Sequence, residues 1–348
     1  MRYRRFGPTG WQVSEIGYGM WGMGGWTGSD DEESLRALDH AFALGCNFFD
    51  TAWAYGMGKS ETLLGQALRA NRDIPAVVAT KMPPKNLKWP ARAEYPVHEA
   101  YPPDHIREYT EKSLQNLGVP AIDLQQFHVW SDVWAEDTGW QRAIDDLKRE
   151  RLIRAVGIST NRWEATNVLR ALETGLIDCV QVVYNVFDQA PEDELFPYCQ
   201  AHDIAVIARV PLDEGSLTGT LTPDSKWPEG DWRNVYFNRD HLSATLARVN
   251  RLMPLVPDGM DLPSWRSGSS SSTGRSARRF PACAGRSTWS GTWERAMASG
   301  CRRGCTTPSG RIGGIACRTR RPDRTGPTPE GQPIMMRDGW ARGRGLGP

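Results

Sequence analysis

Four titratable residues stand at or just after the ends of short apolar runs, namely Asp50, Tyr55, Lys81 and His128. Side chains of these types transfer protons and stabilise charge. A tyrosine alone is a weak acid with a pKa of about 10, and a neighbouring ammonium favours the phenolate and lowers that pKa. A fold that brings Lys81 beside Tyr55 therefore makes a proton donor. The alternative is structural: a buried Asp50–Lys81 ion pair, a tyrosine of the core or rim, and a core histidine.

The apolar runs alternate with amphipathic stretches, which is the pattern of a parallel α/β sheet. The expected strands are Ile16–Met20, Phe48–Thr51, Ala76–Lys81, Ile122–His128, Ala155–Ser159, Cys179–Tyr184 and Ala205–Val210. The expected helices are Glu33–Leu44, Ser60–Ala70, Pro103–Leu117, Trp140–Arg149, Arg162–Leu172 and Glu192–His202. No strand is followed by a G-x-G-x-x-G turn, so the seven strands favour a (β/α)8 TIM barrel over a Rossmann sheet. The four titratable residues would then lie at the C-terminal ends of barrel strands, where barrel active sites are found.

Segments from four parts of the chain together resemble the aldo-keto reductase family in its bacterial form. They are Tyr3–Gly10 with Val13–Gly17, Phe49–Gly56, Ala79–Lys81 and Gln126–His128. The resemblance covers about residues 1–263 and implies a (β/α)8 barrel whose bottom is plugged by an N-terminal β-hairpin.

The resemblance also implies an activity, the NADPH-dependent reduction of aldehydes or ketones to alcohols. Tyr55 would be the general acid, assisted by Lys81. Asp50 would pair with Lys81 and hold it, and His128 would donate a hydrogen bond to the carbonyl oxygen. A second function of the same fold stays open, a cofactor-binding regulatory subunit without significant turnover, like the β-subunits of potassium channels.

Residues that bind the cofactor follow from the same resemblance. The segment Gly157–Asn161 is similar to the family's G-x-S-N turn with one residue added, so Ser159, Thr160 or Asn161 would make the contact. The segment Ala208–Leu212 is similar to A-Y-S-P-L, with Arg209 in place of the aromatic that stacks on the nicotinamide. The implied set is Trp21, Ser159, Asn161, Gln181, Arg209, Pro211, Leu212, Gly215, Ser216 and Leu217.

Some of these cofactor residues also have a structural explanation. Trp21 would be an apolar cap, Gln181 a polar residue of a barrel layer, and Arg209 a salt-bridged arginine of the rim. The glycines of Gly215–Gly219 would belong to a plain turn.

The composition indicates the compartment and the partners to expect for the protein. Seven cysteines, the early ones widely spaced, and no N-terminal signal peptide indicate a reduced, cytoplasmic compartment. No apolar run approaches the ~18 residues of a membrane span. Cys301 and Cys305 lack partners at zinc-finger spacing, so we expect no metal site. The expected partner is a small carbonyl substrate, with no nucleic acid and no membrane.

The sequence changes character after Pro263. Residues 264–348 hold sixteen Arg and four acidic residues, a net charge of +12 within a chain whose total is +1. We therefore predict two parts: an incomplete barrel over 1–263, without an eighth strand and the last helices, and a tail over 264–348 with no fold. A genuine Arg-rich tail that binds nucleic acid or an acidic partner is the alternative.

A shifted reading frame explains the tail. Back-translation with one lost base restored after codon 263 gives an amphipathic helix, a short strand ending in I-P-G-M-R-R, and the start of another helix. These are the missing parts of the barrel. In the family, the I-P-G turn and the residues after it bind the adenosine 2′-phosphate and the adenine, so the chain as written should be impaired.

Inserting one base after codon 263 is expected to raise soluble yield and NADPH-dependent turnover together, because it supplies the eighth strand that covers the exposed sheet edges. Soluble protein and NADPH oxidation with an aldehyde panel are measured for both genes. Equal yield and equal turnover from the two genes would contradict the frameshift hypothesis.

Overall fold

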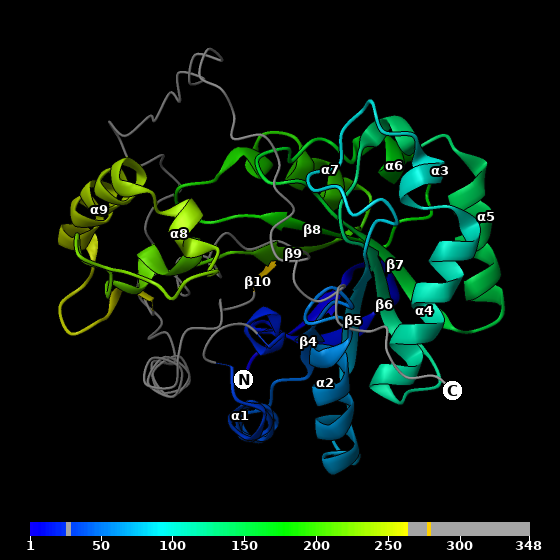
Figure 1. Cartoon of the computed structure of the whole chain (residues 1–348), viewed down its shortest axis with the longest axis horizontal. Helices are drawn as coiled ribbons and strands as arrows, with labels where there is room; N and C mark the ends of the chain where they lie inside the picture. The colour runs from blue at the N-terminus through cyan, green and yellow to red at the C-terminus, as the bar shows by residue number, and fades with distance from the viewer. Residues whose placement is uncertain (26–28, 264–276, 280–348) are drawn as a thin grey trace, which may run out of the picture.

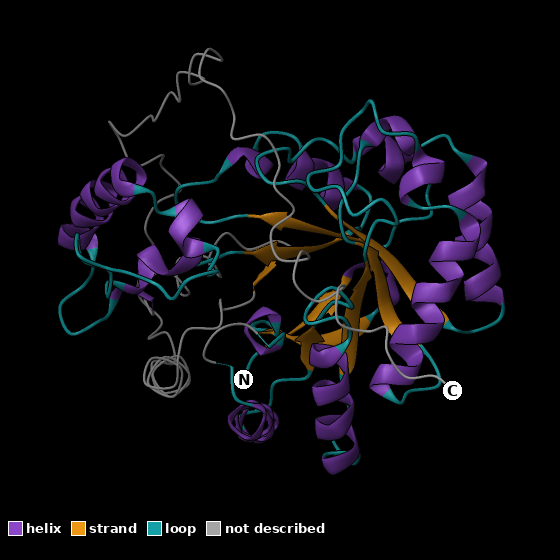
Figure 2. Cartoon of the chain, viewed as in Figure 1, coloured by secondary structure: helices purple, strands orange, loops and turns teal. Residues whose placement is uncertain are grey.

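The computed structural model describes residues 1–25, 29–263 and 277–279 of the 348-residue chain. Within them, eight parallel strands form one curled sheet in the order β10-β9-β8-β7-β6-β5-β4-β3. Figures 1 and 2 show the sheet at the centre and helices around its outside. This is the α/β barrel architecture that the sequence predicts, and it gathers the C-terminal ends of the strands at one end of the molecule.

All seven predicted strands are present, with ends shifted by a few residues. Their bounds are β3 (Tyr18–Gly19), β4 (Phe48–Asp50), β5 (Val77–Met82), β6 (Ile122–Phe127), β7 (Ile153–Ser159), β8 (Cys179–Val183) and β9 (Ala205–Arg209). Strands β4, β6 and β8 are buried along their whole length. A parallel strand is covered on both faces, which explains the largely apolar sequence of β8, and the buried polar residues of β6, Asp123, Gln125 and Gln126, stand out within it.

The eighth strand position differs from the prediction. A three-residue strand, β10 (Ala277–Arg279), pairs in parallel with β9, with Arg278 opposite Ile207. The sequence predicts no eighth strand, and the structure has a very short one. In the described part of the chain, no ladder joins β10 to β3. The rest of the predicted tail, 264–276 and 280–348, lies outside the described residues.

The predicted hairpin plug is present at the bottom of the barrel. Strands β1 (Tyr3–Phe6) and β2 (Trp11–Ser14) pair antiparallel. Phe6 and Val13 are fully buried and pack against the inward-facing residues Phe48, Ala79, Leu124, Ala155, Cys179, Ala205 and Ile207. The turn between the strands needs a glycine, because Gly7 has a positive φ and a Cβ there would lie 2.6 Å from the Ala205 nitrogen. The bottom is therefore closed, which leaves the other end for ligands.

The helices cover the outside of the sheet. The main ones are α1 (Asp31–Ala43), α2 (Lys59–Ala70), α4 (Pro103–Leu117), α5 (Thr138–Arg149), α6 (Leu169–Glu173) and α7 (Leu195–Ala201). Three helices that the sequence analysis did not name are α3 (Val97–Ala100), α8 (Arg233–Tyr236) and α9 (Arg239–Leu252). In the described residues, no helix combines the length and apolarity needed to cross a membrane.

Two helices are shorter than predicted for local reasons. The stretch before α6 cannot be helical because Trp163 has a φ of 63°, and the side chains of Asn161 and Asn167 bond to backbone groups of other segments. Helix α7 begins at Leu195 because Pro197 fits only the first turn of a helix. Because the residues before α6 are not helical, they form a turn that lies over the mouth of the barrel.

Helices α2 and α4 approach each other closely at Gly65, where a Cβ would lie 2.5 Å from the Leu117 carbonyl oxygen. Gly65→Ala should therefore push the helices apart and lower the free energy of unfolding by about 1–3 kcal/mol. Urea unfolding followed by tryptophan fluorescence measures the change. Gln66→Ala, on the exposed side of α2, is the control and should change stability by less than about 0.5 kcal/mol. Equal effects of the two variants would show that the contact does not limit the packing.

Candidate active site

An ion pair is buried at the C-terminal end of the sheet. The Lys81 ammonium, at the end of β5, lies 2.7 Å from Asp50 Oδ2 at the end of β4, and donates a second hydrogen bond of 2.7 Å to the Thr51 carbonyl. Lys81 is 1% exposed and Asp50 is 6% exposed. The adjacent strands bring the two residues together as predicted, and each side chain is the other's hydrogen-bond partner in a buried position.

The second carboxylate oxygen of Asp50 is held by two amides. Gln126 on β6 and Gln181 on β8 each donate from Nε2 to Asp50 Oδ1, at 3.2 Å and 3.1 Å. Asp50 is therefore fixed from three strands. Sequence reasoning missed Gln126, although its place two residues before His128 puts both on one face of β6, since side chains alternate along a strand.

Tyr55 lies over this ion pair. The Lys81 ammonium is 5.1 Å from the centre of the Tyr55 ring, and the His128 ring centre is 5.6 Å from it. Burial raises the pKa of the Tyr55 hydroxyl, while the positive charges of Lys81 and Arg209 act in the opposite direction. The sequence predicts a lowered pKa. Lys81 does lower it, but desolvation is the larger effect, so the phenol stays protonated at neutral pH.

His128 follows β6 directly and faces Tyr55. Burial lowers the pKa of its imidazole well below the ordinary value, and the charges of Lys81 and Arg209 lower it further. Its Nδ1 is buried and has no hydrogen-bond partner in the described part of the chain. The structure thus brings Asp50, Tyr55, Lys81 and His128 to one place, and the histidine there is neutral.

A tryptophan that sequence reasoning missed completes this wall. Trp89, in the segment between β5 and α4, sets its ring edge-on to His128, with the ring centres 4.5 Å apart and the planes at 90°. The indole is 37% exposed. Its position depends on how a long loop folds over the barrel, and the local pattern around Trp89 and Pro90 gives no signal of this.

The turn after β7 supplies one unbonded hydroxyl. Ser159 is buried, and its hydroxyl has no hydrogen-bond partner among the residues described. The Thr160 amide donates to the Gln181 carbonyl at 2.9 Å. Asn161, in contrast, uses both ends of its amide: Oδ1 accepts from the Ala91 amide, and Nδ2 donates to the Ala91 carbonyl. Of the three residues left open by the sequence, Ser159 is the one available to a ligand.

Two arginines face each other behind this turn. Arg209, at the end of β9, donates to the Thr160 carbonyl at 3.0 Å, forms no salt bridge within the described residues, and has a buried Nε without a partner there. Burial lowers the pKa of Arg209, and the charge of Arg162 lowers it further. Arg162 pairs with Glu214 at 2.8 Å and stacks on the Tyr236 ring. Arg162 was not among the predicted site residues.

The loop after β9 is held in an unusual backbone conformation. Val210, Asp213 and Glu214 have φ values of 56°, 46° and 53°, and Gly215 has 103°. A β-branched residue such as Val210 is strained at positive φ, and such strain concentrates at ligand clamps.

The predicted cofactor residues of this loop fall into different environments. Leu212 and Leu217 pack with Val249 and Leu262, while Ser216 donates to Asp213 at 2.6 Å. A Cβ at Gly215 would meet nothing within 4 Å, so open space lies beside its backbone. Trp21, 38% exposed, follows β3 at the rim in a 3-10 turn, Trp21–Met23.

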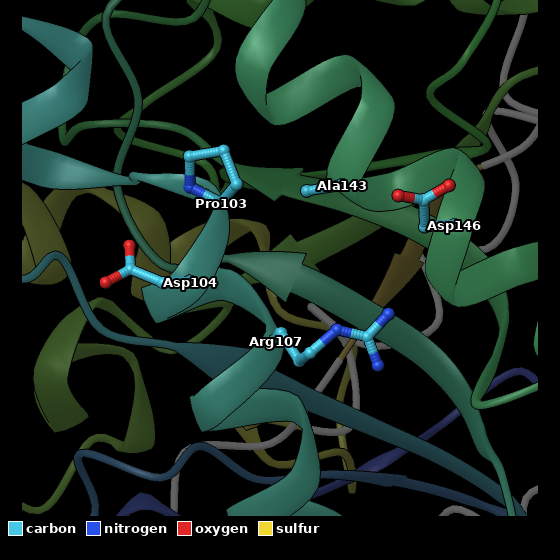
Figure 3. A pocket seen from close by; sticks show the side chains of 5 residues that line it. All are labelled: Pro103, Asp104, Arg107, Ala143 and Asp146. Atoms are coloured by element: carbon cyan, nitrogen blue, oxygen red, sulfur yellow. The ribbon is translucent and has the colours of Figure 1, made fainter.

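Two surface hollows lie away from these residues. Figure 3 shows one of them, between α4 and α5, where Pro103, Asp104 and Arg107 face Ala143 and Asp146. The other is lined by Ala135, Glu136, Gln141, Arg170, Glu173 and Thr174. Neither hollow contains a predicted site residue. In the part of the chain that the structure describes, no group of His, Cys, Asp and Glu could hold a metal ion.

Comparison with known proteins points to one family. The model of the aldo/keto reductase family matches residues 15–255. The NADH-specific methylglyoxal reductase of Escherichia coli is 31% identical over 264 residues, covering 72% of this chain and 79% of that protein. The aldo-keto reductase yakc [NADP(+)] of Schizosaccharomyces pombe is 31% identical over 229 residues, covering 64% of each. A solved aldo-keto reductase of Bacillus halodurans, in its holo form, matches with a TM-score of 0.64 and 25% identity, over 86% of this chain and 91% of that one.

The lowered pKa of His128 predicts a contribution to acid sensitivity. The unfolded chain takes up a proton at this histidine near pH 6.5 and the folded chain does so only at lower pH, so stability is full above about pH 6.5 and falls as the pH drops from there towards the folded pKa. Urea unfolding from pH 7.5 to 5 should show a shallower loss for His128→Gln than for the wild type. Parallel pH dependences would contradict a neutral, buried imidazole.

Proposed function

This chain belongs to the aldo/keto reductase family, and from that premise we propose that it reduces aldehydes or ketones to alcohols with NADPH, using Tyr55 as the proton donor. The observation that carries the proposal is the buried Lys81–Asp50 ion pair beneath the Tyr55 ring. The catalytic unit is residues 1–263.

Tyr55 is suited to give a proton rather than to take one. Burial keeps its hydroxyl protonated at neutral pH. When that proton passes to the developing alkoxide, the phenolate that remains lies close to the Lys81 ammonium, which stabilises it. Asp50 holds the ammonium in place through Oδ2, and a solvent proton restores the tyrosine after product leaves.

His128 is suited to orient the carbonyl. Because its imidazole is neutral, it carries one N–H, and its Nδ1 has no hydrogen-bond partner among the residues that the structure describes. A hydrogen bond from a neutral imidazole polarises the substrate oxygen without competing with Tyr55 for the role of acid.

Several groups around the mouth of the barrel fit a nicotinamide dinucleotide. Within the described residues, the Ser159 hydroxyl and the Arg209 Nε have no hydrogen-bond partner, and Gln181 lies opposite Ser159 in the sheet. The open backbone at Gly215 within the strained loop fits a pyrophosphate, with Pro211, Leu212, Ser216 and Leu217 shaping that loop. Trp21 would bound the pocket at the rim. When bound, the nicotinamide supplies the hydride.

The choice of NADPH has its own support. The restored reading frame contains paired arginines after its I-P-G turn, which suit a 2′-phosphate, and the Schizosaccharomyces relative is named for NADP(+). The Escherichia relative is named for NADH, so dissociation constants for NADPH and NADH in the frame-restored protein are the direct test. Equal values would remove NADPH from the proposal and leave the reductase activity standing.

In the frame-restored protein, Tyr55→Phe should lower the rate of aldehyde reduction by about 10²–10⁴-fold, because it removes the positioned acid and little else. The dissociation constant of the cofactor, followed by protein fluorescence, should stay within a few-fold of the wild type. Tyr95→Phe, a tyrosine outside the site, is the control and should keep the rate. Tyr55→Phe activity close to that of the wild type would show that another group donates the proton.

A further inference from the structure

The segment that carries Trp89 has few connections to the barrel. In the described part of the chain, two hydrogen bonds join residues 86–94 to residues beyond 84–95, and both are with Asn161. The ends of the segment are anchored by the bonds from Lys85 to the Ala100 carbonyl and from Trp134 to the Tyr95 carbonyl. Between these two anchors, the hydrogen bonds that hold the segment near His128 come from one side chain, in the turn after β7.

Asn161 forms two hydrogen bonds with this segment. Its Oδ1 accepts from the Ala91 amide at 3.2 Å, and its Nδ2 donates to the Ala91 carbonyl at 2.8 Å. The same Nδ2 lies 3.1 Å from the Trp130 carbonyl and 2.8 Å from Glu164 Oε2. Asn161 is 3% exposed. A side chain needs one acceptor and one donor to bind both backbone groups of a residue, and an amide has both.

We propose that Asn161 is a positioning residue that fixes Trp89 as a wall of the substrate site, and that this wall favours carbonyl compounds with a flat aromatic substituent. The proposal rests on the function assigned above to Tyr55 and His128. A carbonyl oxygen held by those two residues leaves its substituents within reach of the indole, whose ring centre is 4.5 Å from that of His128. Aromatic rings gain from edge-on or offset contact with such an indole.

This role differs from the contact with the cofactor that the sequence implies for Asn161. Donation from Asn161 Nδ2 to a nicotinamide carboxamide would take this group from Ala91, Trp130 and Glu164, and the buried carbonyls of Ala91 and Trp130 would then lose a partner. The Ser159 hydroxyl is available without any such loss. Asn161 and Ser159 thus divide the turn between the substrate wall and the cofactor.

The positioning role is tested first without reference to turnover. Amide hydrogen exchange of the 348-residue chain is measured for the wild type, Asn161→Ala and Asn167→Ala. Asn167 bonds to Trp130 and Glu164 in the same network but not to Ala91, so it is the matched control. Exchange in residues 86–94 should quicken at least tenfold in Asn161→Ala and stay near the wild type in Asn167→Ala. Equal exchange in all three proteins would overturn the positioning role.

The substrate preference is tested by kinetics with benzaldehyde and propanal. Trp89→Ala, a half-exposed position that should fold normally, is expected to raise KM for benzaldehyde about tenfold and to change KM for propanal less than threefold. Asn161→Ala should shift the ratio of the two KM values in the same direction, with kcat for propanal and the dissociation constant of the cofactor retained.

Two results separate this inference from the proposed function. A raised cofactor dissociation constant in Asn161→Ala, with the KM ratio unchanged, would return Asn161 to the cofactor site and overturn the inference while the reductase stands. A frame-restored protein that binds cofactor and reduces no aldehyde would reject the proposed function, and with it the substrate preference. The exchange experiment would still decide whether Asn161 holds the segment.

Discussion

A lysine and an aspartate buried side by side inside the barrel constrain the whole catalytic end of this molecule. Taking either charge out of water alone would cost several kcal/mol, so the pair persists only with close geometry and further hydrogen bonds. Those bonds come from Thr51 after β4, Gln126 on β6 and Gln181 on β8. Strand β8 is not a neighbour of β4 in the sheet, so Gln181 reaches Asp50 because the sheet curls. The site is therefore a property of the curled sheet rather than of any one loop.

The charges inside this region decide the protonation of their neighbours. Burial lowers the pKa of His128, and the charges of Lys81 and Arg209 lower it further, so His128 stays neutral. Burial also keeps Tyr55 protonated despite the same two charges. His128 is therefore suited to orient the carbonyl oxygen of the substrate, and Tyr55 is suited to protonate it. In the described residues, Ser159 and Arg209 keep hydrogen-bond donors that a ligand could use. Gln181 lies opposite Ser159 in the sheet and donates to Asp50, the partner of Lys81.

The parts of this arrangement that follow from local pattern could be predicted, and those that follow from loop packing could not. Buried parallel strands contain many apolar residues, so the local sequence pattern predicts β4, β5 and β6 and the polar residues at their ends. The hydrogen bonds between Asn161 and Ala91, which help to place Trp89, join residues 70 positions apart in the chain. No local sequence pattern predicts such a contact. The shortened α6 and the strand β10 were missed for a related reason, because backbone conformation at Trp163 and pairing with β9 are set by their surroundings.

The central claim is that Lys81, held by Asp50, acts on the reaction through Tyr55. A double-mutant cycle with Tyr55→Phe, Lys81→Met and the combined variant measures this most directly, with the dissociation constant of the cofactor checked in each protein. If Lys81 acts through the tyrosine, the combined variant should reduce aldehydes about as fast as the slower single variant, because the second change removes nothing further. Rate losses that multiply in the combined variant would contradict the account and assign the two residues to independent roles.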